Sequence, residues 1–417
     1  MDINNSFNFS SKIMDIAEKA ESDIRLRFTE IDRIAEICTA KVLKAFQDHR
    51  VSEACFAATT GYGYGDRGRE TLDLLYADVF GAEKGLVRIG FVNGTHAISS
   101  ALFSLLRPGD TLLAATGRPY DTLCSAIGLT GAYSGSMMDY GIKYAETPLV
   151  EGKPDIEAIR RAASDKKVKV AALQRSCGYT KRKAFSVSEL NEIANAVHEV
   201  NPDAVVFVDN CYGEFTEISE PSADMMAGSL IKNPGGGLAP AGGYITGKKE
   251  LVEAASYRMT APGIGGECGA TLGNNRLLFQ GLFLAPHTVS QAMKTAVFCA
   301  RMMELLGYKT LPSSREERSD IVQIIELGSP QGLKRFCTGI QSGAPVDAYV
   351  TPEAWDMPGY DDKIIMAAGA FIQGASIELS ADGPMREPYS AYLQGGLTYE
   401  SGKLGVMLAA ERLLSEM

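Results

Sequence analysis

The pattern of hydrophobic and polar positions predicts a helical start followed by alternating strands and helices. Over residues 1–50, apolar side chains such as Ile13, Ile16, Ile31 and Ile34 recur at roughly helical spacing among charges. From residue 86 onward, the apolar runs LVRIGFV, TLLAAT, KVKVAALQ and AVVFVDN predict strands, and segments such as SVSELNEIANAVHEV between them predict helices. The runs are almost continuously apolar, which is typical of parallel strands covered on both faces. The pattern therefore predicts an α/β fold with a mostly parallel central sheet.

The later part of the chain predicts a second, smaller unit. The strands ADMMAGSLI and YITG flank a glycine-rich loop, and a long helix is expected from about residue 274 to residue 306. Beyond it, DIVQIIELG, IIMAAGAFI and SIELS are the expected strands of a mixed α+β region. One hydrophobic core stops growing near ~250–300 residues, so 417 residues predict more than one domain. We expect a helical segment over 1–50, a large domain over 51–300 and a small domain over 301–417.

Composition and charge argue against several classes of protein. Lys and Arg number 41 against 51 Asp and Glu, a net charge of −10 that disfavours a nucleic-acid binder dependent on phosphate contacts. No apolar run reaches the ~18 residues of a membrane span, and the N-terminus lacks the pattern of a signal peptide. Eight cysteines without a CxxC pair, and four histidines, give no support for a metal site or a disulfide framework. We therefore expect a cytoplasmic protein with no metal, nucleic acid or membrane partner.

Residues of chemical interest follow the predicted strands, where ligands of open α/β sheets bind. Gly94 and Thr95 open a helix after LVRIGFV, and such a helix start suits a phosphate, although most of these turns bind nothing. Tyr120 follows TLLAAT and suits stacking on a flat ring or plain packing. Asp209 ends AVVFV, where a buried carboxylate needs a metal, a sugar hydroxyl or a protonated ring nitrogen as its partner. Lys232 lies between an apolar run and a glycine-rich loop. This position is compatible with a surface lysine or with a functional one.

Together these features fit pyridoxal phosphate better than any one of them does. A lysine forms an imine with the aldehyde of this cofactor, and an aspartate keeps the pyridine nitrogen protonated, so that the ring accepts electrons from the substrate. The sequence therefore predicts a pyridoxal-phosphate enzyme built on Lys232 and Asp209, with the helix start at Gly94 for the phosphate.

The chain resembles the fold type I pyridoxal-phosphate enzymes of cysteine and methionine metabolism, which include methionine gamma-lyases and cystathionine beta-lyases. The resemblance rests on GYGYGDRGRE, FVNGTHAI, QRSCGYTKR, VDNCYGEF, GSLIKNPGGGLAPAGGYITG and YLQGGLTYESGK, and is greatest to the branch of aluminium-resistance proteins. It runs in order over about residues 60–250 and more loosely to the C-terminus. It implies the PLP-dependent transferase-like fold of aspartate aminotransferase, with a smaller C-terminal α+β domain, and a homodimer or homotetramer with shared active sites.

The resemblance also implies a role for each matching residue. Lys232 carries the imine, Asp209 pairs with the pyridinium, and Tyr120 stacks on the ring. The implied phosphate contacts are Gly94, Thr95, His96 and Ser229. Ile231 stands where better-known relatives have threonine, so one phosphate contact is missing or replaced.

Two implied contacts keep alternatives open. In relatives, a tyrosine and an arginine of a neighbouring subunit reach the phosphate, and the loop here offers Tyr62 or Tyr64 together with Arg67. An amino-acid substrate also needs a cation for its carboxylate. Arg386, after SIELS, and Arg175, at the end of KVKVAALQ, are the candidates.

The predicted reaction is elimination from a sulfur-containing amino acid such as cystathionine, cysteine or methionine. Lys232 removes the Cα proton, and the products are a thiol, ammonia and a 2-oxo acid; the sequence does not distinguish a β from a γ leaving group. An aldolase or an aminotransferase with the same cofactor is the alternative, followed by a non-catalytic metal-tolerance protein. A nucleotide-binding role for GYGYGDRG is disfavoured because no strong strand precedes it.

Overall fold

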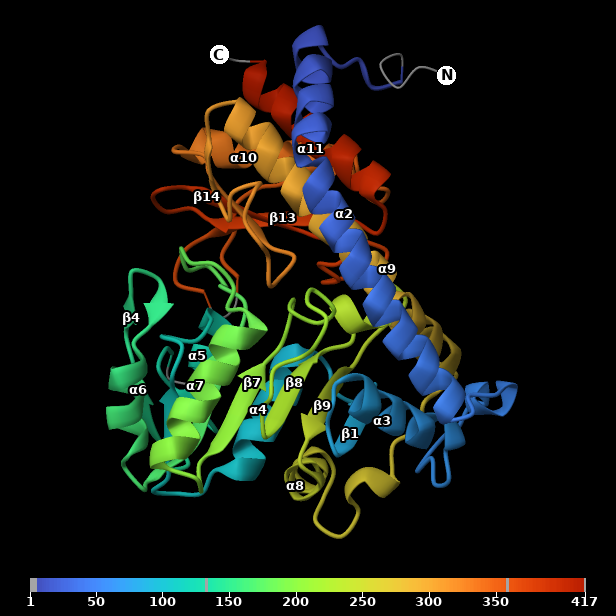
Figure 1. Ribbon diagram of the computed structural model, residues 1–417, viewed down its shortest axis with the longest axis vertical. Helices are drawn as coiled ribbons and strands as arrows, with labels where there is room; N and C mark the ends of the chain where they lie inside the picture. The colour runs from blue at the N-terminus through green and yellow to red at the C-terminus, as the bar shows by residue number, and fades with distance from the viewer. Residues whose placement is uncertain (1–5, 132–133, 358–359, 416–417) are drawn as a thin grey trace.

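The computed structural model describes residues 6–131, 134–357 and 360–415, and shows two β-sheets joined by long helices (Figure 1). The predicted N-terminal helix is present as α2 (Ser11–Asp48), where the Ser10 side chain accepts a hydrogen bond from the Ile13 N–H. Its buried residues, which include Ile13, Ile24 and Ile31, lie along one stripe that packs on α9 (Asn275–Leu305). The apolar spacing read from the sequence is therefore the contact surface between two long helices.

The larger sheet has seven strands in the order β1-β9-β8-β7-β6-β2-β3. The strands are β1 (Lys84–Arg88), β2 (Thr111–Ala114), β3 (Lys143–Glu146), β6 (Val168–Gln174), β7 (Val205–Asp209), β8 (Met225–Ser229) and β9 (Gly243–Gly247). Four neighbouring pairs, from β3 through β2, β6 and β7 to β8, are parallel, whereas β9 runs antiparallel to both of its neighbours. The expected mostly parallel sheet is confirmed.

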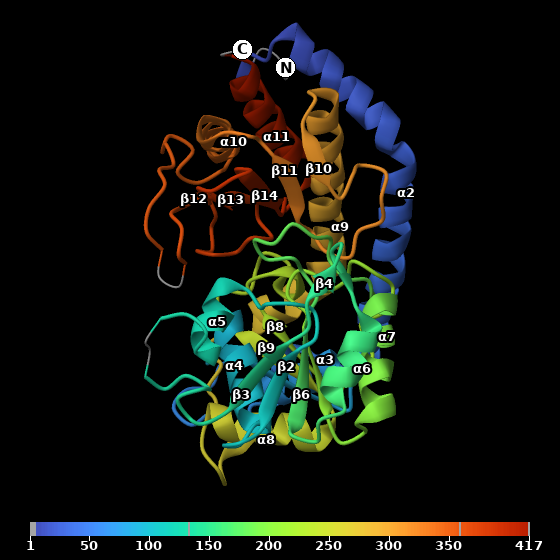
Figure 2. The ribbon, with the colours of Figure 1, turned by 90° about the vertical axis from the view of Figure 1, so that its left-hand side faces the viewer.

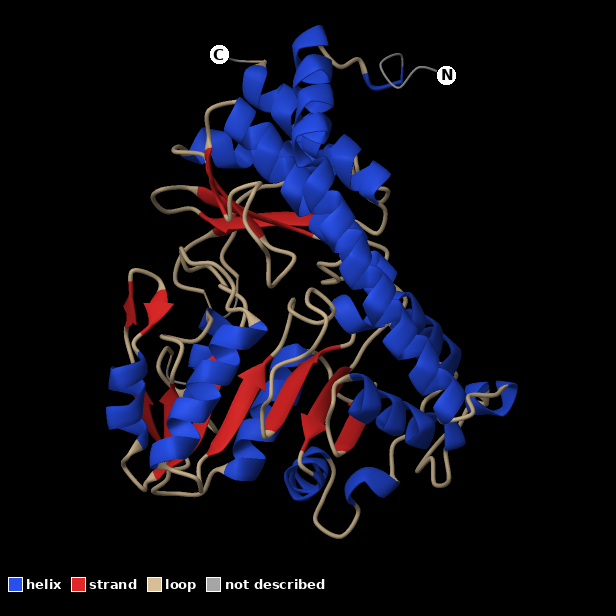
Figure 3. Cartoon of the chain, in the orientation of Figure 1, coloured by secondary structure: helices blue, strands red, loops and turns tan. Residues whose placement is uncertain are grey.

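Helices cover both faces of this sheet, as Figure 3 shows. Helices α4 (Gly94–Leu105), α5 (Asp121–Ile127) and α8 (Lys249–Met259) share one hydrophobic cluster with Leu112 and Phe207. Helices α3 (Arg67–Val79), α6 (Ile156–Ala163) and α7 (Val187–Val200) share another with the adjacent strand residues Leu113 and Val206. Successive strand side chains point to opposite faces, so the continuous apolar runs reflect burial on both sides.

The second sheet is antiparallel, with five strands in the order β10-β11-β14-β13-β12. These are β10 (Lys309–Leu311), β11 (Gln323–Glu326), β12 (Ile364–Ala367), β13 (Ser380–Pro384) and β14 (Ser390–Gln394), with α10 (Pro330–Ser342) and α11 (Tyr399–Leu414) beside them. A two-stranded ribbon, β4 (Leu149–Val150) and β5 (Lys153–Pro154), and short 3-10 helices at Glu53–Phe56, Asn233–Gly235 and Gly265–Glu267 complete the elements.

One predicted strand is wrong. Residues 376–378 of SIELS form a turn, and the strand begins only at Ser380 and continues through SADGP. Asp-Gly-Pro is typical of turns. Here it lies between two partner strands, and a Cβ at Gly383 would stand 2.3 Å from the Ser390 carbonyl oxygen. The strands can pair this closely only because residue 383 has no side chain. Tertiary packing therefore overrides the preference of Asp-Gly-Pro for a turn.

The two sheets lie on either side of residue 300, but α9 runs unbroken through that position and contacts strands of the second sheet. The three predicted domain ranges therefore stay predictions. Both chain ends lie at the same end of the molecule (Figure 2), where Glu411 of α11 accepts hydrogen bonds from the N–H and the hydroxyl of Ser10, each 2.9 Å long. No helix within the described residues combines the length and the apolar character needed to cross a membrane.

Candidate active site

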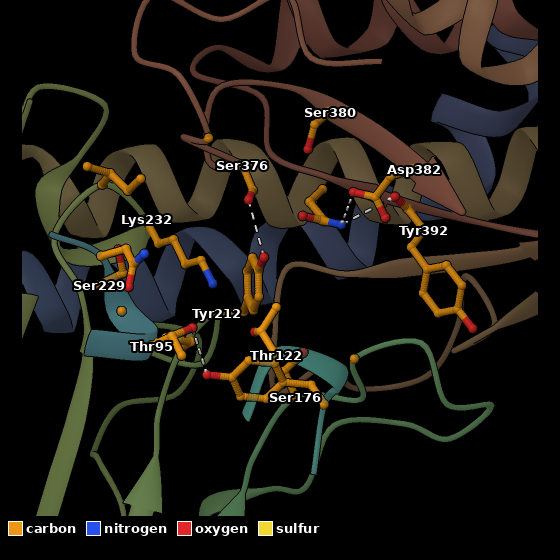
Figure 4. Close-up of a pocket in the computed structure, with 18 of the residues that line it drawn as sticks. Thr95, Thr122, Ser176, Tyr212, Ser229, Lys232, Ser376, Ser380, Asp382 and Tyr392 are labelled. Carbon is orange, nitrogen blue, oxygen red and sulfur yellow. Dashed lines mark hydrogen bonds between the residues drawn. The ribbon is translucent and has the colours of Figure 1, made fainter. Parts of the chain in front are cut away.

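A cavity of about 480 Å³ lies between the carboxyl ends of the parallel strands and the second sheet (Figure 4). Six of the residues predicted from the sequence line it: Gly94, Thr95, Tyr120, Asp209, Ser229 and Lys232. The opposite wall comes from the C-terminal part and includes Ser376, Ser380, Asp382, Tyr392 and Gln394. Strand order thus brings together residues that are more than 130 positions apart in the sequence.

Lys232 and Asp209 face the same cavity from the ends of neighbouring strands. Asp209 is buried and accepts a hydrogen bond from the Cys211 N–H at 3.1 Å. Burial raises the pKa of Asp209, and the charge of Lys232 opposes this rise. Burial alone lowers the pKa of Lys232, but the acidic groups around it, Cys211 and Asp209 among them, outweigh burial and hold the pKa well above its usual value. Each charge therefore stabilises the other.

The start of α4 offers unused hydrogen-bond donors beside Ser229. Asn93 caps this helix by accepting a hydrogen bond from the His96 N–H at 2.8 Å. The N–H groups of Gly94 and Thr95 have no acceptor within the helix. Ser229 Oγ is buried and has no hydrogen-bond partner among the described residues. A Cβ at Gly94 would stand 3.0 Å from the Ser229 Cβ, so the glycine keeps this space open.

His96 does not reach the cavity. Its Nδ1 accepts a hydrogen bond from the Val92 N–H at 3.1 Å, and its own backbone N–H is taken by Asn93. Neither group is free for a phosphate, so the predicted contact from His96 is not supported by this geometry.

Tyr120 is fixed on two sides at the start of α5. Its hydroxyl lies 3.1 Å from Thr95 Oγ1, and its backbone N–H donates to the Gln174 side chain at 2.9 Å. Burial raises the pKa of Tyr120, and the Asp209 carboxylate adds to this effect, so the phenol is neutral. A ring held in this way presents a fixed flat surface to the cavity.

Sequence reasoning missed Tyr212, which follows Asp209 by three residues. Lys232 Nζ lies 3.9 Å from the centre of the Tyr212 ring, and the Tyr212 hydroxyl lies 3.2 Å from Ser376 Oγ (Figure 4). The backbone of Tyr212 has a φ of 72°, an uncommon value for a residue with a side chain. The sequence VDNCY places this aromatic residue close after the strand that ends at Asp209, and this position could have identified it as a cavity residue. Tyr212 bridges the two walls of the cavity and contacts the lysine.

Asp382 was also missed, and it lies across the cavity from Lys232 (Figure 4). Burial raises the pKa of Asp382 to about 6. Its Oδ2 accepts from Gln394 Nε2 at 3.3 Å, while Oδ1 has no partner among the described residues. No sequence pattern pointed to this residue, because SADGP is typical of a turn.

The two predicted arginines lie outside the cavity lining. Arg175 is fully buried, and its guanidinium donates to Asn210 and Glu217 at 2.8 Å and to Glu220 at 3.2 Å. These partners occupy Arg175, so it is not available to a substrate, which corrects that expectation. Arg386 is exposed and pairs with Asp362 at 2.8 Å.

The loop 61–67 also lies outside the cavity of its own chain. Tyr62 and Tyr64 are 70% and 64% exposed, and their rings stack with centres 5.5 Å apart, while Arg67 is exposed beside them. Buried residues fix the loop from beneath: Asp66 accepts from the Arg69 N–H, and the Arg69 guanidinium donates to the Gly63 carbonyl at 2.7 Å. The loop is thus a firmly anchored, outward-facing aromatic and cationic surface.

Comparison with known proteins identifies the family. The model of the methionine gamma-lyase family matches residues 13–414. The uncharacterized protein YnbB of Bacillus subtilis (strain 168) is 51% identical over 405 residues, which are 96% of each chain. The structure of a carbon-sulfur lyase involved in aluminum resistance from Clostridium novyi NT is 49% identical, with a TM-score of 0.95 over 99% of this chain and 98% of that one.

A more distant structure shares the fold. The pyridoxal-5'-phosphate-dependent protein YhfS from Escherichia coli is 16% identical, with a TM-score of 0.60 over 91% of this chain and 96% of that one. The chain therefore belongs to the methionine gamma-lyase family, and its fold class and its reaction class, that of a lyase acting on carbon–sulfur bonds, are those that the sequence resemblance predicted.

Proposed function

We propose that this chain binds pyridoxal phosphate in the cavity and uses it to cleave the carbon–sulfur bond of a sulfur-containing amino acid. The observation that carries the proposal is that Lys232, Asp209, Tyr120 and the unpartnered hydroxyl of Ser229 all line one cavity. The products are a thiol, ammonia and a 2-oxo acid.

The residues present fit the cofactor at each of its polar groups. Ser229 Oγ and the free N–H groups of Gly94 and Thr95 suit the phosphate, because helix starts and hydroxyls bind phosphate oxygens. Asp209 suits a protonated ring nitrogen, and a cation there would offset the cost of burying its carboxylate. Tyr120 suits the face of the ring, and Lys232 suits the aldehyde carbon.

Residues of the chain then carry out the proton transfers. When bound, pyridoxal phosphate accepts the electron pair left on Cα after the Cα–H bond breaks. Lys232 Nζ takes the Cα proton and delivers a proton to the departing sulfur. For a sulfur on Cγ, Lys232 also takes a proton from Cβ. Tyr212 lies against Nζ through its ring and positions the lysine for these steps.

Arg386 is the proposed partner of the substrate carboxylate. It lies outside the cavity lining, but its charge acts on Asp121 and Tyr392, which do line the cavity. Its ion pair with Asp362 is exposed, so exchanging this partner for a substrate carboxylate costs little.

We also propose a homodimer or homotetramer with shared active sites, in the cytoplasm. The exposed group formed by Tyr62, Tyr64 and Arg67 supports shared sites, because it is fixed in position yet lies outside the lining of the active-site cavity of its own chain. All eight cysteines are unpaired, which is expected in a reducing compartment.

The test is to locate the cofactor and identify the products. We expect borohydride to fix pyridoxal phosphate to Lys232, detected by mass spectrometry, and we expect Lys232→Ala to lower lyase activity by roughly 10²–10⁴-fold. Lys248→Ala, which changes an exposed lysine, is the matched control and keeps the activity. Ammonia and a 2-oxo acid from cystathionine, cysteine or methionine support the proposal. A new amino acid would instead indicate an aminotransferase, and the absence of both adduct and product would indicate a binding protein.

A further inference from the structure

Strand β13 carries two buried, unsatisfied oxygen atoms on residues that line the cavity. Asp382 Oδ1 and Ser380 Oγ are buried and have no hydrogen-bond partner among the described residues. Each residue is 7% exposed, and the two are separated by one position, so they lie on the same face of the strand. Buried polar atoms are almost always paired in native proteins. Two unpaired ones on residues that line a cavity indicate a ligand group that meets them there.

The charges around the cavity indicate which kind of ligand group binds next to β13. Lys232 is the one cationic side chain among the described residues that line the cavity, and it lies on the opposite side (Figure 4). Gln394 donates to Oδ2 of Asp382 and Tyr179 also hydrogen-bonds to this carboxyl group, yet Oδ1 has no partner among the described residues. With its pKa at about 6, Asp382 is mostly ionised at neutral pH. A buried carboxylate with a free oxygen is stabilised by a cation that donates hydrogen bonds to it.

The position of the wall shows which part of a substrate reaches it. The α-amino group of the substrate is used at the cofactor, on the side of Lys232. The α-carboxylate is repelled by Asp382. The group that meets β13 therefore belongs to the part of the molecule that leaves with the sulfur.

We propose that Asp382 and Ser380 bind a primary ammonium group on the leaving, sulfur-bearing part of the substrate. This inference rests on the proposed lyase function. It names the substrate class as thioether amino acids whose sulfur substituent carries an amino group, and it predicts poor use of methionine, whose S-methyl group is small and neutral.

The test compares two substrates that differ by one charge. S-(2-aminoethyl)-L-cysteine and S-propyl-L-cysteine have the same length beyond sulfur, and one ends in an ammonium where the other ends in a methyl group. Water and the first compound give 2-aminoethanethiol, ammonia and pyruvate. We expect wild type to favour the ammonium substrate in kcat/KM by roughly ten-fold or more, the value of a charged hydrogen bond. If the enzyme eliminates a leaving group on Cγ, the corresponding S-substituted homocysteines replace these two cysteine derivatives.

Substitutions on β13 test whether the preference for the ammonium substrate comes from this strand. Asp382→Asn is expected to remove most of the preference, and Ser380→Ala, a milder change, to reduce it by a few-fold. Glu326→Gln removes a carboxylate from β11 of the same sheet, outside the cavity lining, and is expected to keep the wild-type ratio. An equal ratio in wild type and Asp382→Asn, or a wild-type preference for the propyl compound, overturns the proposal.

A binding measurement separates failure of this inference from failure of the proposed function. If wild type cleaves neither these compounds nor cystathionine, cysteine or methionine, the lyase proposal fails, and calorimetry of both compounds with wild type and with Asp382→Asn still decides the ammonium site. Tighter binding of the ammonium compound to wild type, with the advantage lost in Asp382→Asn, supports the site. Equal binding of the two compounds to wild type overturns it.

Discussion

Glu214 is a buried carboxyl group whose titration predicts a pH-dependent loss of stability. Its Oε1 accepts a hydrogen bond from the Tyr244 hydroxyl at 2.8 Å, and Oε2 has no partner among the described residues. Burial raises the pKa of Glu214 from its usual 4.5 to about 8; Glu220 adds to the rise, and the hydrogen bond from Tyr244 and the charge of Lys232 oppose it. The folded protein therefore holds this proton more tightly than the unfolded chain does.

The size and the sign of the effect follow from this difference. The stabilisation from proton binding is fully present below pH 4.5, is lost as the pH rises to about 8, and does not change further above that pH. The slope is about 1.36 kcal/mol per pH unit, so wild type loses up to about 2.7 kcal/mol from this group between pH 6 and pH 8. Glu214→Gln keeps the shape and an acceptor for Tyr244 but cannot ionise, so it avoids this loss.

The assay is urea unfolding of wild type and Glu214→Gln at pH 6, 7 and 8. The difference between the two free energies of unfolding is expected to shift by about 2–3 kcal/mol in favour of the variant as the pH rises. Other titrating groups cancel in this difference. Glu199→Gln, which removes an exposed carboxylate, is the control and is expected to follow the wild-type curve. Parallel curves for wild type and Glu214→Gln refute the reasoning.

Two further predictions concern the cofactor and the subunits. Ser229→Ala removes the unpartnered hydroxyl and is expected to weaken pyridoxal phosphate binding by roughly 10–100-fold in a titration of the stripped protein, whereas the exposed Ser222→Ala leaves it unchanged; equal affinities would remove Ser229 from the phosphate site. Mixing Lys232→Ala chains with Arg67→Ala chains is expected to restore activity through hybrid sites. A mixture no more active than its components would show that each site is built from one chain.

The elements that could be predicted from the sequence are those whose burial shows directly as a run of apolar residues. Continuous apolar runs identified the parallel sheet, and Asp209 and Lys232 stood out as charged residues where such runs end. Arg175 also lies at the end of an apolar run, but its predicted role in binding the substrate carboxylate was wrong. Its partners Glu217 and Glu220 lie more than 40 residues later in an irregular segment, and no local pattern shows that they fold back onto it.

The C-terminal wall of the cavity was beyond local reasoning for a different reason. SADGP has the residues of a turn, and β13 exists because β12 and β14 pair with it on both sides. Asp382 reaches the cavity only through that pairing. Strand positions that depend on distant partners, and the side chains they present, require the three-dimensional structure.

The pairing of α2 with α9 has a consequence for the chain while it is being made. Helix α2 ends at residue 48 and α9 ends at residue 305, so 305 − 48 = 257 residues separate the two ends. At ~5–20 residues per second, ribosomes need on the order of 13–50 s to supply that stretch. During this interval the part of the apolar stripe of α2 that packs on α9 has no partner, and Ser10 becomes able to bind Glu411 only later still. The nascent protein therefore exposes a surface of the kind that chaperones bind, long before its catalytic cavity can form.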